Sequence, residues 1–331
     1  MKNLSTAAAL LALASAAPLG AQKEPEGQPS PNEIVEQASA EEWQGIAPED
    51  LLVMTLAPPD RGPRQASADG SEREVVIQLM PPPFSQGWVE NIRTLARAGW
   101  YDGISINRVQ DNYVVQWGDP NVDNPEADGP AKPLPEGLNE VPETLYVRAT
   151  LAPKVERDAC REEQAPDTLL CDTYAPGAFF VSGFPAAGNG SHEWPVHCYG
   201  MVGVGRSYSP DTGSGAELYT VIGHAPRHLD RNIALVGRVV EGIEHLSSLP
   251  RGKGALGFYE DASKRVPIRS IRVASDLAAS DQPRFEYLST ESETFARYAD
   301  ARANRRDPFF IVPAGGADIC NIPVPVRRVA N

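Results

Sequence analysis

The sequence predicts a mainly β protein, built as a barrel or a sandwich. Two observations point to this class: many short runs rich in Val, Ile and aromatic residues, and one clear helical pattern early in the chain. The 31 Pro and 28 Gly among 331 residues favour frequent turns and little long helix. Hydrophobic residues make up 41% of the chain, which is enough for a buried core.

The charge of the chain narrows the possible partners. Lys and Arg number 30 against 44 Asp and Glu, which gives a net charge of −14. A sequence-independent grip on nucleic acid needs a basic face, and docking on anionic lipid needs basic clusters. No apolar stretch of the sequence is long enough to span a bilayer. We therefore expect neither nucleic acid as a partner nor an integral membrane span.

The N-terminus has the pattern of a secretory signal peptide over residues 1–21. Lys2 precedes an apolar Ala/Leu run at 7–17, and Ala14-Ser15-Ala16 forms a cleavage signature, with cutting after Ala21 as a second option. A buried N-terminal helix is the alternative. The signal peptide predicts a periplasmic or secreted protein. Residues 22–49, which are polar and rich in Pro and Glu at their start, are expected to form a flexible lead.

The elements of the expected barrel follow in order. Strand-like runs at 50–56 and 74–79 flank a Pro/Gly/Ser-rich turn region at 58–72, which favours a hairpin. Val89, Ile92, Leu95 and Ala96 fall on one face of a helix that Gly99 would end. Long loops are expected over 120–198. Further short strands are expected within 101–117 and at 145–148, 179–181, 201–204, 218–222, 234–239 and 267–273.

The pattern changes after Ala274, and residues 276–331 are expected to form a C-terminal extension. Thr290-x-x-Glu293 matches a capping box. It predicts a helix through Phe295, Tyr298 and Ala301, and Pro308 would end this helix before a Pro-rich tail. We expect an appendage that packs on the barrel.

Four cysteines, an even number in an exported chain, favour disulfides, and three pairings are possible. We expect Cys160–Cys171, because the acidic loop between them closes easily, and Cys198–Cys320, which would tie the tail to the body. The alternative is a zinc site of Cys198, His197 and His192. Adjacent ligands without a C-x-x-C partner are a weak metal signal, and no metal or cofactor is predicted.

One segment carries a specific motif. Residues 101–119, YDGISINRVQDNYVVQWGD, closely resemble the strand–loop–strand that holds the catalytic arginine of cyclophilin-type peptidyl-prolyl isomerases. A second block over 200–242, which starts GMVGVG and ends LVGRVVEG, is similar to the second half of that family in order and spacing. The resemblance covers residues 50–275. It implies an eight-stranded antiparallel barrel capped by two helices, with an outer groove for peptides that contain X-Pro.

The resemblance also implies roles for single residues. Arg108 stands at the catalytic arginine and Gln116 at the groove glutamine, while Tyr113, Val114, Tyr219 and Leu229 stand in the proline pocket. Several positions depart from the family pattern. Glu217 replaces a glutamine that contacts the substrate backbone. In the alternative, purely structural role, Glu217 would pair with Arg206 or Arg108. Gly205-Arg206 replaces an Ala-Asn pair that holds the peptide, so Gly205, like Glu217, is expected in the substrate-binding groove. The remaining departures are Ile233 and Asn107 for His and Trp117 for Gly, and His228 stands where Trp or His is common.

The chemistry needs no nucleophile, metal or cofactor. Rotation about a peptide bond has a barrier of about 20 kcal/mol, and the cis and trans forms of an X-Pro bond differ by only about 0.5–1 kcal/mol. A catalyst must therefore prefer the twisted amide, in which the proline nitrogen regains its lone pair. Because a guanidinium is always charged and has rigid donors, Arg108 can donate a hydrogen bond to that nitrogen while an apolar pocket holds the ring.

Three hypotheses follow. The first is a peptidyl-prolyl isomerase that acts on proline-containing polypeptides among exported proteins. The alternative is a catalytically weak or inactive cyclophilin-like chaperone or scaffold of the cell envelope, which the substitutions at Glu217, Ile233 and Gly205-Arg206 favour. A third is a structural envelope domain whose tail docks a partner.

Overall fold

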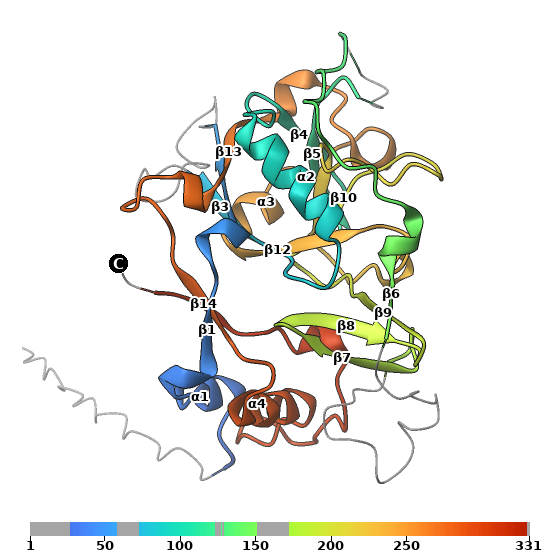
Figure 1. Cartoon of the computed structure of the whole chain (residues 1–331). Helices are drawn as coiled ribbons and strands as arrows, with labels where there is room; N and C mark the ends of the chain where they lie inside the picture. Colours follow the sequence, from blue (N-terminus) through green and yellow to red (C-terminus); the bar gives the residue numbers. More distant parts are fainter. Residues whose placement is uncertain (1–26, 58–72, 123–126, 128, 151–171, 330–331) are drawn as a thin grey trace, which may run out of the picture.

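The computed structural model describes residues 27–57, 73–122, 127, 129–150 and 172–329 (Figure 1). Eight strands close into a barrel in the order β10-β11-β5-β4-β13-β2-β3-β12, and every neighbouring pair is antiparallel. This confirms the predicted eight-stranded barrel. Its strands are β2 (Leu51–Leu56), β3 (Arg73–Leu79), β4 (Ser105–Val109), β5 (Val114–Gly118), β10 (Met201–Val204), β11 (Leu218–Val221), β12 (Leu235–Glu241) and β13 (Val266–Val273).

Two helices pack on the barrel. The helix α2 (Gln86–Arg97) buries Trp88, Ile92 and Leu95 completely, so the predicted helix is confirmed. Gly99 follows it with φ +63°, a left-handed conformation that glycine adopts without strain. The second helix is the short α3 (Glu244–Ser247). No helix in the described ranges has the length and apolar composition needed to cross a bilayer.

The region predicted as long loops contains a sheet of its own. Its strands lie in the order β6-β9-β8-β7, namely β6 (Arg148–Ala149), β7 (Gly177–Val181), β8 (Phe184–Gly188) and β9 (His192–Pro195). The predicted strand at 145–148 was mostly wrong: a 3-10 helix, η3 (Glu143–Tyr146), occupies it. Tyr146 stacks on Trp88 with ring centroids 5.5 Å apart, and this packing favours a turn of helix over an extended strand.

Both ends of the described chain fold together, which differs from the expected flexible lead. The lead forms α1 (Pro31–Glu36) and β1 (Trp43–Gly45). The strand β1 pairs with β14 (Phe285–Leu288), β14 pairs with β15 (Val326–Arg328), and α4 (Glu293–Ala303) lies against α1 (Figure 1). A separate core joins the two ends through Ile34, Trp43, Leu288, Phe295, Tyr298 and Ile322.

Capping hydrogen bonds set the starts of both terminal helices. The helix α1 has a capping box, in which Ser30 N–H donates to the Glu33 carboxylate at 2.7 Å and Glu33 N–H donates to Ser30 Oγ at 3.4 Å. In α4, Ser292 Oγ accepts from Phe295 N–H at 3.0 Å. The predicted capping box at Thr290 was therefore wrong by two residues, although the predicted helix is present.

A disulfide joins the barrel to the extension. Cys198 and Cys320 are bonded with Cα atoms 5.1 Å apart, which confirms this predicted pair. The zinc alternative is wrong because Cys198 Sγ is committed to the disulfide, and the described residues contain no group of three or more His, Cys, Asp or Glu that could hold a metal ion. The predicted Cys160–Cys171 pair, the signal peptide and the turn region at 58–72 lie outside the described residues.

Short 3-10 turns complete the described fold. They are η1 (Ala40–Glu42), η2 (Pro48–Asp50), η5 (Arg227–Leu229), η6 (Ala255–Gly257), η7 (Ala262–Lys264), η8 (Ala274–Asp276) and η9 (Ile319–Asn321). Two of them bear on the site below: η5 carries charged residues behind the predicted proline pocket, and η6 lies against β4.

Candidate active site

A cavity of about 1000 Å³ opens on the outside of the barrel, over β4, β5, β10 and β11. All eight residues that the sequence predicted for catalysis or substrate binding line it: Arg108, Tyr113, Val114, Gln116, Gly205, Glu217, Tyr219 and Leu229. Ile233 and Arg206, two of the departures from the family pattern, line it as well. The structure therefore brings together eight predicted residues that are up to 121 positions apart in the chain.

A bulge in β4 directs Arg108 to the cavity. The pairing with β5 runs from Ile106 opposite Trp117 to Arg108 opposite Gln116, so Asn107 is the extra residue. Asn107 is buried and fixed, because its Oδ1 accepts from Ser105 Oγ at 2.6 Å and its Nδ2 donates to the Gly118 carbonyl at 3.2 Å. Asn107 thus holds the backbone that carries the arginine.

Three acceptors hold the Arg108 guanidinium in place. Nε donates to the Leu256 carbonyl at 2.7 Å, Nη1 donates to Gln116 Oε1 at 3.0 Å, and Nη2 donates to Gln110 Oε1. Within the described part of the chain these bonds use three of the five N–H donors of the guanidinium, which leaves two that a substrate can accept from. A held cation with donors to spare can stabilise charge that develops on a bound amide.

Two aromatic rings lie near the Arg108 guanidinium. Its guanidinium lies 5.7 Å from the ring centroids of both Tyr113 and Phe258. Burial lowers the pKa of Arg108, while Tyr113 and Glu217 act in the opposite direction. The side chain still stays charged, because a free guanidinium loses its proton only at very high pH.

Beside the arginine lies an apolar pocket. Val114, Tyr219 and Val221 form a buried cluster, and the partly buried Tyr113 and Ile233 pack against it. Tyr219 is only 5% exposed, and burial raises its pKa well above the ordinary value, so its hydroxyl keeps its proton at neutral pH. A cluster of this kind suits the ring of a substrate proline.

The substituted residue Glu217 acts through Gln116. Glu217 Oε2 accepts from Gln116 Nε2 at 2.8 Å, which leaves Gln116 Oε1 to face Arg108. The Arg206 guanidinium donates to the carbonyls of Ser207 and Asn232 at 2.6–3.0 Å. Glu217 therefore orients the groove glutamine, and through it the arginine.

Two glycines, one in β10 and one directly after it, make room for the pocket. Gly203 lies opposite Tyr219, and a Cβ there would sit 2.3 Å from the tyrosine hydroxyl. A Cβ on Gly205 would sit 2.9 Å from Glu217 Cβ. Sequence reasoning included Gly205 and missed Gly203, although a glycine inside a strand is a known signal of close approach.

Sequence reasoning also missed residues from distant segments. Leu256 and Phe258 reach Arg108 because the stretch after α3 runs beside β4, where Phe258 and Arg108 form an isolated β-bridge. That stretch has no periodicity that would place it there. His197, a candidate zinc ligand in the sequence, instead binds the Tyr219 hydroxyl through Nε2 at 2.8 Å. His228 stacks on Tyr113 with ring centroids 6.2 Å apart.

Comparisons with known proteins agree with the barrel fold. Residues 74–273 match the family model described as cyclophilin type peptidyl-prolyl cis-trans isomerase. The cyclophilin AquaCyp293 from Hirschia baltica is similar in structure, with a TM-score of 0.59 and 19% identity over 88% of this chain and 98% of that one.

A cyclophilin-type isomerase of Cryptosporidium parvum, solved in the presence of the dipeptide Ala-Pro, is more distant, with a TM-score of 0.35 and 11% identity over 70% of this chain and 98% of that one. A search of the curated proteins found no match. The family match covers more than half of the chain, and the barrel agrees with it. The chain therefore belongs to the cyclophilin-type peptidyl-prolyl cis-trans isomerase family.

Proposed function

We propose that this chain accelerates cis-trans isomerisation of X-Pro bonds in exported polypeptides, with Arg108 as the catalytic residue. The observation that carries the proposal is a guanidinium held by Leu256, Gln110 and Gln116 beside an apolar pocket. Membership of the family supports peptidyl-prolyl isomerase chemistry in general.

The mechanism follows from differential binding. The proline ring enters the pocket of Val114, Tyr219 and Leu229, and the rest of the peptide lies along the groove past Gln116. As the amide twists, its nitrogen regains a lone pair, and a free N–H of Arg108 donates to it. Because the planar forms offer no such acceptor, the site stabilises the transition state more than the substrate.

The test is an isomerisation assay on a short peptide that contains Ala-Pro, with the wild type, Arg108→Ala and Arg108→Lys. Losing one preorganised donor commonly lowers kcat by about 100- to 1000-fold, and we expect a loss of this size for Arg108→Ala. Lysine keeps the charge but not the planar donors, so it should restore little. The matched control is Arg306→Ala, an exposed arginine paired only at 3.3 Å with Asp300 among its described contacts. Equal rates for Arg108→Ala and the wild type would refute the mechanism.

Export is a second part of the proposal. It rests on the signal-peptide pattern of residues 1–21 and agrees with the Cys198–Cys320 disulfide, because disulfides persist in oxidising compartments. Expression in a Gram-negative host followed by fractionation and N-terminal sequencing tests it. We expect a periplasmic or secreted product that starts after Ala16 or Ala21, and an uncut product in the cytosol would contradict export.

A second candidate function is a peptide-binding chaperone or scaffold with little turnover. Glu217 and Arg206, which replace peptide-holding residues of the family, favour it, since both line the cavity and each brings a charge to a position where the family has a neutral amide. The same assay separates the two functions. Binding of the Ala-Pro peptide without rate enhancement, and indifference of that binding to Arg108→Ala, would select the scaffold.

A further inference from the structure

The floor of the pocket contains a hydrogen bond that the proposed reaction does not require. The Tyr219 hydroxyl lies 2.8 Å from His197 Nε2, and the two rings are stacked with only 8° between their planes. An apolar pocket needs only an aromatic ring, so a phenyl group would serve. A buried hydroxyl, in contrast, needs a partner, and His197 supplies it from a fully buried position.

The direction of this hydrogen bond follows from the next one. Asp230 Oδ1 lies 2.9 Å from His197 Nδ1 and also accepts from the His197 backbone N–H at 3.0 Å. Because a carboxylate only accepts, Nδ1 carries the imidazole proton and Nε2 accepts from the Tyr219 hydroxyl. Burial lowers the pKa of His197, which favours this neutral form.

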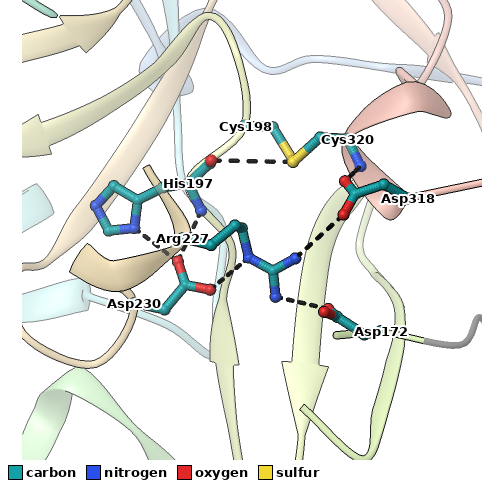
Figure 2. The surroundings of a disulfide bond; sticks show 7 residues. All are labelled: Asp172, His197, Cys198, Arg227, Asp230, Asp318 and Cys320. Carbon is teal, nitrogen blue, oxygen red and sulfur yellow. Dashed lines mark hydrogen bonds and ion pairs between the residues drawn. A yellow bond between two sulfur atoms is a disulfide. The ribbon is translucent and has the colours of Figure 1, made fainter. Parts of the chain in front are cut away.

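Asp230 is in turn fixed by a buried arginine. Arg227 Nε donates to Asp230 Oδ2 at 2.7 Å, and Arg227 Nη2 donates to Asp172 at 2.6 Å (Figure 2). Asp318 of the extension lies 3.8 Å from the same guanidinium. Figure 2 also shows Cys198, the residue after His197, bonded to Cys320 of the extension. The histidine is thus held by both its side chain and its backbone.

The strand that faces Tyr219, β10, provides the space for its ring. Gly203 has no side chain where a Cβ would lie 2.3 Å from the Tyr219 hydroxyl and 2.4 Å from the ring carbon that bears it. The ring can therefore lie flat across β10 and reach His197. The space at Gly203 and the fixed acceptor His197, which precedes β10 in the chain, together define one position for the Tyr219 ring.

We propose that His197, held by Asp230, is a positioning residue that fixes the ring of Tyr219 and so sets the affinity of the pocket for the proline ring. This inference rests on the proposed function. His197 itself makes no contact with the reacting bond, and its effect passes through Tyr219. It should therefore change KM and peptide affinity, while kcat, which depends on Arg108, changes little.

The test compares Tyr219→Phe, His197→Phe and the double variant. For each we measure kcat, KM and, by NMR titration without turnover, the Kd of an Ala-Pro peptide. We expect Tyr219→Phe to raise KM and Kd about fivefold and His197→Phe about tenfold, with kcat within about twofold. The double variant should be no weaker than His197→Phe alone, because both single changes remove the same hydrogen bond.

A control and a spectroscopic readout separate positioning from simple stability. Tyr298→Phe removes another largely buried tyrosine hydroxyl, which donates to the Pro323 carbonyl at 2.7 Å in the extension core, and it should leave KM unchanged. Histidine ¹⁵N shifts should show a proton on Nδ1 in the wild type and a change at Nε2 in Tyr219→Phe.

Each outcome decides the proposal. If the wild type binds the peptide but does not accelerate isomerisation, the proposed function fails, and the Kd values still test the positioning role. Wild-type Kd in Tyr219→Phe, which should fold because it loses only one oxygen, would overturn the inference. Absence of peptide binding by the wild type would overturn it as well, as would a proton on Nε2.

Discussion

Replacing Gly203 with alanine perturbs the pocket without removing any polar group from it. The new Cβ would lie 2.3 Å from the Tyr219 hydroxyl and 2.4 Å from Cζ, against an ordinary contact of about 3.5 Å. The ring must therefore move by roughly 1 Å. A shift of that size away from β10 stretches the 2.8 Å bond to His197 beyond hydrogen-bond range.

The magnitude follows from two contributions. An extra methyl in a packed interior costs about 1–3 kcal/mol, and an unpaired buried polar group costs about 1–3 kcal/mol more. We therefore expect the free energy of unfolding to fall by about 2–6 kcal/mol. The affinity for an Ala-Pro peptide should fall as well, because the displaced ring enters the space of the substrate proline.

Urea unfolding and NMR titration with the peptide measure both effects. Gly45→Ala is the matched control, since Gly45 is also a strand glycine and no atom lies within 4 Å of its added Cβ. Alanine there should be neutral or stabilise by up to about 1 kcal/mol. If Gly203→Ala unfolds and binds peptide like Gly45→Ala, the argument that Gly203 makes room for Tyr219 is refuted.

Two further predictions concern stability. The Cys198–Cys320 bond closes a separation of 122 residues, so chain entropy predicts that Cys198→Ala with Cys320→Ala loses up to about 5 kcal/mol in urea unfolding; a loss below about 1 kcal/mol would contradict that reasoning. Burial lowers the pKa of His197 below the ordinary value of 6.5, so just below pH 6.5 the unfolded chain binds a proton at this imidazole that the folded chain does not. The free energy of unfolding should therefore fall by at most about 1.4 kcal/mol per pH unit as the pH drops below about 6.5. His197→Phe should lack this component, and parallel curves of stability against pH for the two proteins would refute it.

The barrel could be predicted from the sequence because its signals are local. Strands such as Leu51–Leu56 and Val266–Val273 are short runs rich in β-branched and aliphatic residues, and the helix Gln86–Arg97 has its apolar residues on one face and a glycine after its end. The site could be predicted because Arg108 and Tyr219 each lie within a motif of fixed spacing. Such motifs report which residues face a groove, whatever the loops between them contain.

The unit in which both ends of the described chain fold together, with α1, β1, β14, α4 and β15, could not be predicted in the same way. Its sheet pairs Trp43 with Leu288, residues that are far apart in the chain, and nothing in either short run indicates the other. One local signal was present, since Ser30 and Glu33 have the spacing of a capping box and Pro31 follows the cap. The polar, Pro-rich composition around it outweighed that signal, and the segment was predicted to be flexible.

The hydrogen bonds of His197 and Asp230 behind the pocket show which neighbours a buried tyrosine hydroxyl requires. A tyrosine in place of a phenylalanine adds a hydroxyl that must be given both space and a partner once it is buried. Gly203 gives the space from the facing strand, and His197 gives the partner from the residues that lead into the same strand. Cys198 ties those residues to the extension, so the position of Tyr219 depends on a segment more than 100 residues away. A fragment of this chain that ends at Val273 lacks that segment and should therefore bind proline peptides more weakly than the full chain.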